Sequence, residues 1–277
     1  MKNIIIIITL GLLVSCASNN VDQHKKADLY FSHGTQKLIE QDYTEALKNL
    51  LEAQKLDPKN PKIINNLAMA YYFKGKPDIA MKMLKDSLDL DENNSDARNN
   101  IASIYYTENK IDLAQKEYEI ILNDLLYQHT YRVQYNLALI AFKKGNRKKA
   151  MEYLELAVGN RADYCPASYM LAREYRLSGQ TAKALETFKV ATRENCAKNP
   201  QAFFEWGQLL AELGRDDEAR EKFNYVIDKF PKSEYFTPAL NGKNNIKKSN
   251  ISENGGNNIL KIFIMIYDIL KNLMLKD

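Results

Sequence analysis

Alanine and large apolar residues recur along the chain at a nearly fixed interval of 34 to 36 residues. Four residues after each alanine stands a Leu, Tyr or Phe, and thirteen residues before it an apolar position is followed at once by Gly or Ala. Small residues let two helices approach closely, and large apolar ones fill the space around them. The pattern therefore predicts six pairs of packed helices. The alanines are Ala46, Ala80, Ala114, Ala150, Ala184 and Ala219.

Each unit is predicted to contain a first helix, A, and a second helix, B. In five of the six units the stretch between them carries a residue that tolerates a left-handed backbone. These residues are Gly75, Asn109, Gly145, Gly179 and Gly214, and Gln41 is the exception. The segments "LDPKNP" and "KFPKS" place Pro where one unit ends. A two-helix unit of 34 residues resembles the tetratricopeptide repeat, here over residues 27–238. The resemblance implies an all-α superhelical solenoid in which helices A line a concave surface.

Repeats 3 and 4 are separated by two residues more than most of the others. The excess lies between Ala114 and Ala150, in the segment "NDLLYQHTYR". A bend in the solenoid and a tolerated insertion both fit this spacing.

The first twenty residues, "MKNIIIIITLGLLVSCASNN", read as an export signal that ends in a lipid anchor. The apolar run Ile4 to Val14 is too short for a spanning helix, which needs about 20 residues. Lys2 before this run and small residues after it are typical of a signal peptide, predicted over residues 1–15. The four residues ending in Cys16 resemble the bacterial lipobox, which implies lipid on that thiol and a tether over residues 16–26. Cleavage of an ordinary signal peptide nearby is the alternative.

The resemblance to lipoproteins also implies a location in the bacterial cell envelope. Ala17 and Ser18 follow the cysteine, with no Asp. In lipoproteins of this kind the absence of Asp permits transport to the outer membrane. We therefore expect the chain at the periplasmic face of that membrane.

Cys165 and Cys196 remain as a pair if lipid occupies Cys16. They stand at positions 1 and 32 of repeat 5. Helix B of an antiparallel pair ends near the start of helix A, so the two thiols are expected at the same pole of the repeat. In an oxidising compartment this predicts a disulfide, with two unpaired small apolar side chains as the alternative.

Charge and composition point away from nucleic acid and from catalysis. The 39 basic and 35 acidic residues interleave, which leaves a net charge of +4 and no basic stripe. The three His residues have no partners at metal-ligand spacing, and His33, at an apolar repeat position, is expected to pack. We expect no enzyme activity, no cofactor, no metal site and no small-molecule substrate.

The predicted concave face presents amide and aromatic side chains on the helices A of repeats 2 to 4. Amides can bond an extended peptide backbone while aromatic rings cover apolar side chains, which predicts a protein partner. In an alternative interpretation the Asn residues only join neighbouring helices. The carboxylate clamp of cochaperone repeats lacks its required residues here. The candidate binding residues are Asn66, Tyr72, Asn100, Tyr106, Tyr135, Asn136 and Phe142.

After Pro238 the apolar period stops. Residues 239–258 are rich in Asn, Lys and Gly and are predicted to form a disordered linker. Residues 259–277 predict an amphipathic helix, whose role is open between docking, membrane association and an accidental extension of the reading frame.

Several features together resemble the pilotin family of type IV pilus systems, the PilF, PilW and Tgl group. They are the lipobox, the six repeats, the stretch from Tyr131 to Ala157 after the longer connection, and the final "KFPKSEYF". Membership would imply an outer-membrane-anchored protein that helps a secretin ring to localise and assemble. An adaptor for cell-wall enzymes and a subunit for outer-membrane protein assembly are the alternatives.

Overall fold

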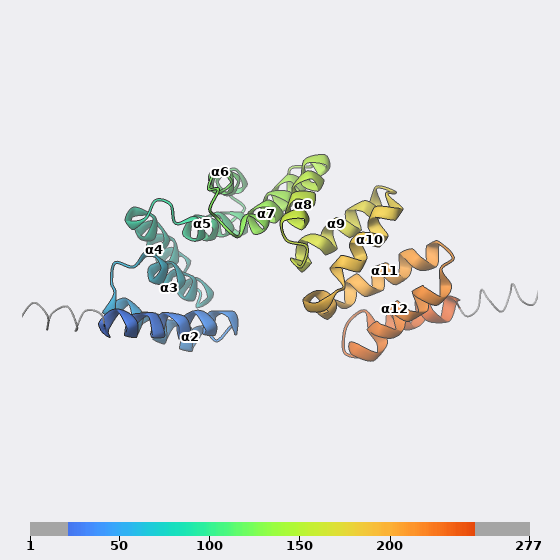
Figure 1. Cartoon of the computed structure of the whole chain (residues 1–277), viewed down its shortest axis with the longest axis horizontal. Coiled ribbons are helices and arrows are strands. Elements are labelled where there is room, and N and C mark those ends of the chain that lie inside the picture. Colours follow the sequence, from blue (N-terminus) through green and yellow to red (C-terminus); the bar gives the residue numbers. More distant parts are fainter. Residues whose placement is uncertain (1–21, 247–277) are drawn as a thin grey trace, which may run out of the picture. The chain divides into compact units, whose positions relative to one another are not determined.

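The computed structural model describes residues 22–246 and divides the chain into two compact units at Asn146 and Arg147. Both units consist of helices joined by short connections (Figure 1). None of the helices in residues 22–246 is long and apolar enough to cross a membrane. Residues 1–21, which hold the predicted signal peptide and Cys16, and residues 247–277 lie outside the described part.

Unit 1 contains seven described helices. A helix over residues 22–39 comes first. The others, coloured blue to green in Figure 1, are α2 (Tyr43–Leu56), α3 (Pro61–Phe73), α4 (Pro77–Leu90), α5 (Ser95–Thr107), α6 (Ile111–Ile121) and α7 (Thr130–Lys143). Successive helices pack against each other, and the helices A also touch directly, α3 against α5 and α5 against α7.

Unit 2 repeats this arrangement with α8 to α12. Its elements are α8 (Arg147–Asn160), α9 (Cys165–Leu177), α10 (Thr181–Ala191), the 3-10 helix η1 (Glu194–Lys198), α11 (Pro200–Glu212) and α12 (Asp216–Lys229). A last described helix covers residues 236–246. Repeat 4 thus contributes its helix A, α7, to unit 1 and its helix B, α8, to unit 2.

Side-chain caps start several helices A. The Asn60 side chain accepts hydrogen bonds from the backbone N–H groups of Lys62 and Ile63, and Pro61 occupies the first helical position. Asn199 and Pro200 begin α11 in the same way. Because Pro has no N–H to lose at that position and an Asn side chain satisfies the first free donors, the segments that join repeats stop one helix and start the next.

All six turns between helices A and B use the left-handed backbone. The glycines at 75, 145, 179 and 214 have φ of 70 to 75°, and Asn109 has φ of 63°. Gln41, which the sequence marked as the exception, adopts the same conformation with φ of 62°. The turn is therefore a property of the fold, and Gln41 bears the steric cost that Gly avoids.

The core consists of the repeated positions. Leu67 of α3 packs against Ala46 and Leu50 of α2, and Ile101 of α5 packs against Ala80 and Leu84 of α4. These apolar positions therefore face the preceding repeat. His33 occupies the corresponding position in the helix over residues 22–39 and is exposed, so the expectation that it packs is wrong. Within the described residues no earlier repeat covers this face.

The segment after Pro238 continues as a helix. The prediction of a disordered linker is wrong for residues 239–246, where Ala239 and Ile246 are buried. Gly242 lies against the ring of Phe223, because a Cβ built on it would stand 2.8 Å from Phe223 Cζ. The helix over residues 236–246 therefore packs against α12. At the other end, residues 22–26 of the predicted tether belong to the first helix.

Candidate partner-binding surface

Helices α3, α5 and α7 present their helix A faces side by side within unit 1. All seven candidate binding residues lie on these three helices. The structure thus brings the sequence-predicted residues onto neighbouring helices. Each of them is half-buried, so part of every side chain remains accessible.

A row of hydrogen bonds between side chains, here called the amide ladder, links three helices of this surface. Asn66 donates from Nδ2 to Thr35 Oγ1 at 2.8 Å, and Asn65 donates to Asn66 Oδ1 at 3.0 Å. Asn100 of α5 then donates to Asn65 Oδ1 at 2.9 Å. Asn66 and Asn100 therefore join neighbouring helices, as the alternative interpretation expected. Because these bonds fix the side chains, the ladder also holds this face in one arrangement.

Two Asn side chains beside the amide ladder make fewer hydrogen bonds than the residues of the ladder. The carbonyl oxygen Oδ1 of Asn99 is buried and has no hydrogen-bond partner. Asn136 of α7 makes no side-chain hydrogen bond to another described residue, although it occupies the repeat position of Asn66 and Asn100. A buried acceptor without a donor costs about 1–3 kcal/mol. The polar groups of this surface are therefore not all satisfied by the chain itself.

Tyr72, Tyr106 and Phe142 stand six residues after the Asn of their own helix, and Tyr135 stands next to Asn136. The Tyr72 hydroxyl lies 3.1 Å from Thr107 Oγ1, and because Thr107 donates its own proton to Ile104 O, Tyr72 is the donor. Lys143 Nζ lies 5.3 Å from the centre of the Tyr106 ring. Burial, with a smaller contribution from Tyr106, raises the pKa of Tyr135 above its ordinary value. Phe142 is half-buried on α7.

A hollow lies on the helix A face of unit 2, which the sequence argument did not single out. Arg173, Arg176, Leu177, Phe204, Gln208 and Tyr235 are among the residues that line it. Tyr169 donates to Glu205 at 2.7 Å, and Arg176 pairs with Glu212, so charged groups take the place of the amide ladder. Part of the signal was present in the sequence, because Tyr169, Arg176, Phe204 and Glu205 occupy the same repeat positions on α9 and α11 as the candidates in unit 1.

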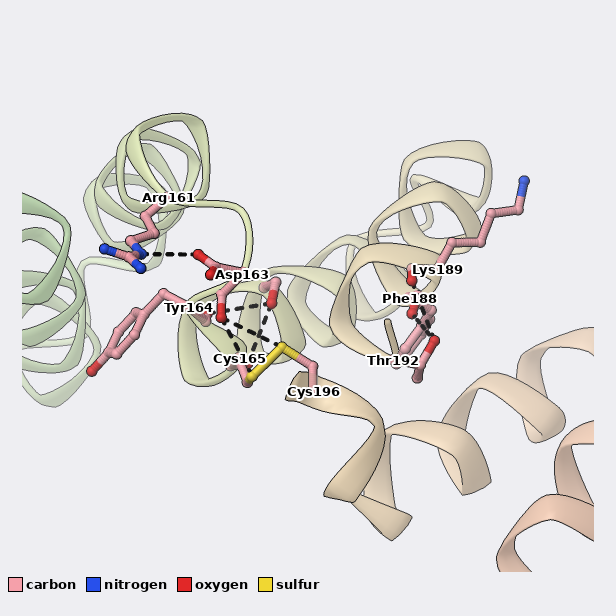
Figure 2. The surroundings of a disulfide bond; sticks show 9 residues. Arg161, Asp163, Tyr164, Cys165, Phe188, Lys189, Thr192 and Cys196 are labelled. Carbon is pink, nitrogen blue, oxygen red and sulfur yellow. Dashed lines mark hydrogen bonds and ion pairs between the residues drawn. A yellow bond between two sulfur atoms is a disulfide. The ribbon is translucent and has the colours of Figure 1, made fainter. Parts of the chain in front are cut away.

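The predicted disulfide is present in unit 2. Cys165, the first residue of α9, is bonded to Cys196 of η1, with a Cα–Cα distance of 5.2 Å (Figure 2). Cys196 is buried, and both sulfur atoms lie within 3.6 Å of the carbonyl oxygen of Asp163. Beside them Arg161 Nε contacts Asp163 Oδ1 at 2.9 Å. The bond closes repeat 5 at the pole where its helix pair begins and ends.

Lipidation and metal binding were also considered in the sequence. Cys16 lies outside the described residues, so its lipidation stays a prediction. In residues 22–246 no group of three His, Cys, Asp or Glu residues could hold a metal ion.

Family models match four segments of the chain. Models described as tetratricopeptide repeats match residues 169–234, 131–164 and 62–90, and one described as a TPR repeat matches residues 36–75. Together with the paired helices and their common turn, these matches identify the repeat. The chain is a tetratricopeptide-repeat protein. No curated protein matches this tetratricopeptide-repeat chain significantly in sequence.

Solved structures of other tetratricopeptide-repeat proteins share the fold. Pseudomonas aeruginosa PilF is 18% identical with a TM-score of 0.66, and the match covers 78% of this chain and 97% of PilF. PilW, a widely conserved type IV pilus biogenesis factor, is 22% identical with a TM-score of 0.61, covering 77% and 98%. YrrB, a TPR protein with an unusual peptide-binding site, is 20% identical with a TM-score of 0.50, covering 70% and 97%. At these identities the likeness concerns the fold.

Proposed function

We propose that this tetratricopeptide-repeat protein is a pilotin-type scaffold that helps the secretin of a type IV pilus to localise and assemble. Lipid on Cys16 anchors it to the periplasmic face of the outer membrane. The helix A face of unit 1 binds an apolar segment of the secretin. Support comes from the lipobox in the sequence and from fold matches that span nearly the whole of PilF and PilW, of which PilW is a pilus biogenesis factor.

The observation that carries the proposal is the row of half-buried aromatic residues next to the amide ladder. Tyr72, Tyr106 and Phe142 come from three adjacent helices, and the ladder joins the first two of these helices. A surface held in place before binding loses less conformational entropy when a partner docks. Partly exposed rings can still gain burial against an apolar partner side chain. The chain therefore offers a preformed surface for a peptide segment.

Anchoring explains how binding would promote assembly. A lipid-tethered scaffold and a secretin subunit meet on one membrane, which raises the effective concentration of each for the other. Captured subunits then encounter each other more often than free ones. Such a role needs binding and release only, so the proposal includes no catalytic step.

An adaptor for cell-wall enzymes and a subunit of the outer-membrane protein assembly machinery remain the alternative functions. Co-purification of the full chain after mild detergent extraction distinguishes the three. Secretin in the eluate supports the proposal, whereas hydrolases or barrel-assembly components without secretin contradict it.

The binding surface is tested in the same experiment by a matched pair of variants. Tyr72→Ala, Tyr106→Ala and Phe142→Ala combined should abolish recovery of secretin. Tyr153→Ala, which removes an aromatic ring outside the proposed surface, should not. Equal recovery with both variants would place the binding site elsewhere on the chain.

A further inference from the structure

Leu125 and Leu126 project from the connection between α6 and α7, and we call this pair the leucine knob. Their side chains are 95% and 90% exposed, more than any other large apolar residue in the described part of the chain. The next most exposed is Ile39, at 71%. Single exposed leucines are ordinary on protein surfaces, but two adjacent ones with almost no contact to their own chain are not.

Hydrogen bonds hold the connection in this form. The Asp124 carboxylate accepts a bond from Ser95 Oγ at 2.6 Å and another from the backbone N–H of Leu126 at 3.0 Å. The Tyr127 hydroxyl donates to Asp96 at 2.9 Å, so both ends of the leucine knob are tied to the start of α5. The two leucines therefore point outward because the backbone around them is fixed by bonds that a collapsed loop would lose.

An apolar hollow adjoins the leucine knob. Its lining includes Ile120 and Ile121 of α6 together with both leucines. Arg98 also borders it, but its guanidinium is paired with Glu117 at 2.8 Å. The hollow can therefore receive an apolar side chain without leaving an unpaired cation beside it.

The surroundings of the leucine knob are acidic. Glu92 and Asp124 line this apolar hollow, and Asp91, Asp96 and Asp124 line a neighbouring hollow that also includes Leu126. None of these four residues forms an ion pair within residues 22–246. Hydrogen bonds from Ser95 and from the Leu126 backbone lower the pKa of Asp124, so this carboxylate is charged at neutral pH. Lys62 and His129 border the same region. The four carboxylates still outnumber these basic groups, which favours a positively charged ligand.

We propose that the leucine knob is a second docking surface, which binds a partner segment whose apolar residues alternate with Lys or Arg. The apolar residues enter the hollow against Ile120 and the two leucines, while the basic residues face the carboxylates. This surface lies on the connection between repeats and involves none of the residues assigned to secretin binding. The chain would then hold two partners at once, which goes beyond the proposed function.

The test uses two synthetic amphipathic peptides of equal length with identical apolar residues. One carries Lys at every polar position and the other Glu, and binding to the full chain is measured by fluorescence anisotropy. The Lys peptide should bind and the Glu peptide should not. Leu125→Ser with Leu126→Ser should weaken binding at least about tenfold, because it removes two apolar side chains that line the hollow, and a central apolar contact commonly carries that much affinity. The charge variant Asp91→Asn with Glu92→Gln should weaken it as well.

Matched controls distinguish binding at the leucine knob from nonspecific binding to exposed apolar residues. Leu156→Ser with Leu213→Ser removes two exposed leucines from unit 2 and should leave the affinity for the Lys peptide unchanged. The proposal is overturned if both peptides bind equally well, or if the knob variant binds as the wild type does. It is also overturned if the knob mediates only self-association in sedimentation velocity or only binding to phospholipid vesicles, since the occupant would then be a second copy or a membrane.

Discussion

Gly242→Ala should destabilise unit 2, because the backbone at Gly242 lies directly against the buried ring of Phe223. A Cβ on Gly242 would lie 2.8, 3.0 and 3.2 Å from ring atoms of Phe223. On α11, a Cβ on Gly207 would lie 2.8, 3.0 and 3.2 Å from Cε1, Cδ1 and Cζ of the same ring. The backbones of α11 and of the helix over residues 236–246 therefore both lie close to this ring, which leaves it little room to move away from a methyl group at position 242. Phe223 is also only 2% exposed, so it cannot escape toward solvent.

Two opposing effects set the size of the change. Forcing an extra methyl group into a packed core costs about 1–3 kcal/mol, and more where the neighbours cannot move. Replacing Gly by Ala inside a helix gains about 1 kcal/mol. Because the ring of Phe223 is buried and lies close to two backbones, we expect the steric cost in the upper part of its range, about 2–3 kcal/mol. The free energy of unfolding should therefore fall by about 1–2 kcal/mol.

The fluorescence of Trp206, the only tryptophan in the chain, reports this unfolding in urea. The indole is 8% exposed in α11, in the repeat that holds Gly207 and Phe223, so its signal follows unit 2. Gly159→Ala is the matched control, because Gly159 lies in α8 with nothing within 4 Å of its added Cβ. That variant should be unchanged or more stable by up to about 1 kcal/mol.

A double variant tests the cause directly. Phe223→Leu alone should destabilise the protein, but it should reduce the further cost of Gly242→Ala, so that the two changes are less than additive. If Gly242→Ala behaves like Gly159→Ala, the helix over residues 236–246 does not pack on Phe223 as described, and the reasoning is refuted.

Three further predictions concern stability. Cys165→Ser with Cys196→Ser should lower the free energy of unfolding by about 3.7 kcal/mol, which is the chain-entropy value for a separation of 31 residues. A urea titration that shows a loss of less than about 1 kcal/mol would contradict this prediction. Gln41→Gly should raise the melting temperature, since it relieves a positive φ worth about 1 kcal/mol, whereas Gly75→Ala should lower it. Tyr72→Phe should cost about 1 kcal/mol through the lost bond to Thr107, measured by calorimetry, and no change would mean that the bond contributes nothing.

The repeat architecture could be predicted because its determinants are local and periodic. Small residues such as Ala46 and Ala80 stand where helices meet, and each is fully buried as the spacing requires. The disulfide followed from the same periodicity, because positions 1 and 32 of an antiparallel pair lie at one pole. Residue type was less informative at the turns, where Gln41 adopts the conformation that Gly favours.

Other features depend on contacts that no local pattern records. The Asn- and Gly-rich composition after Pro238 indicated disorder, but Gly242 serves as a site of close approach to α12. The roles of Asn66 and Asn100 could not be chosen from the sequence, because an amide suits a peptide ligand and a neighbouring helix equally well. The exposure of Leu125 follows from the hydrogen bonds of Asp124 to residues before and after it, which only the folded chain brings together.

The amount of multimeric secretin in the cell envelope tests the central claim most directly. It is measured in a deletion strain complemented with the wild-type chain, with the combined Tyr72→Ala, Tyr106→Ala and Phe142→Ala variant, or with the Tyr153→Ala control. Our account predicts multimers with the wild type and the control, and a severe loss with the combined variant at equal protein level and equal helicity. Normal multimers with a stable combined variant would contradict it.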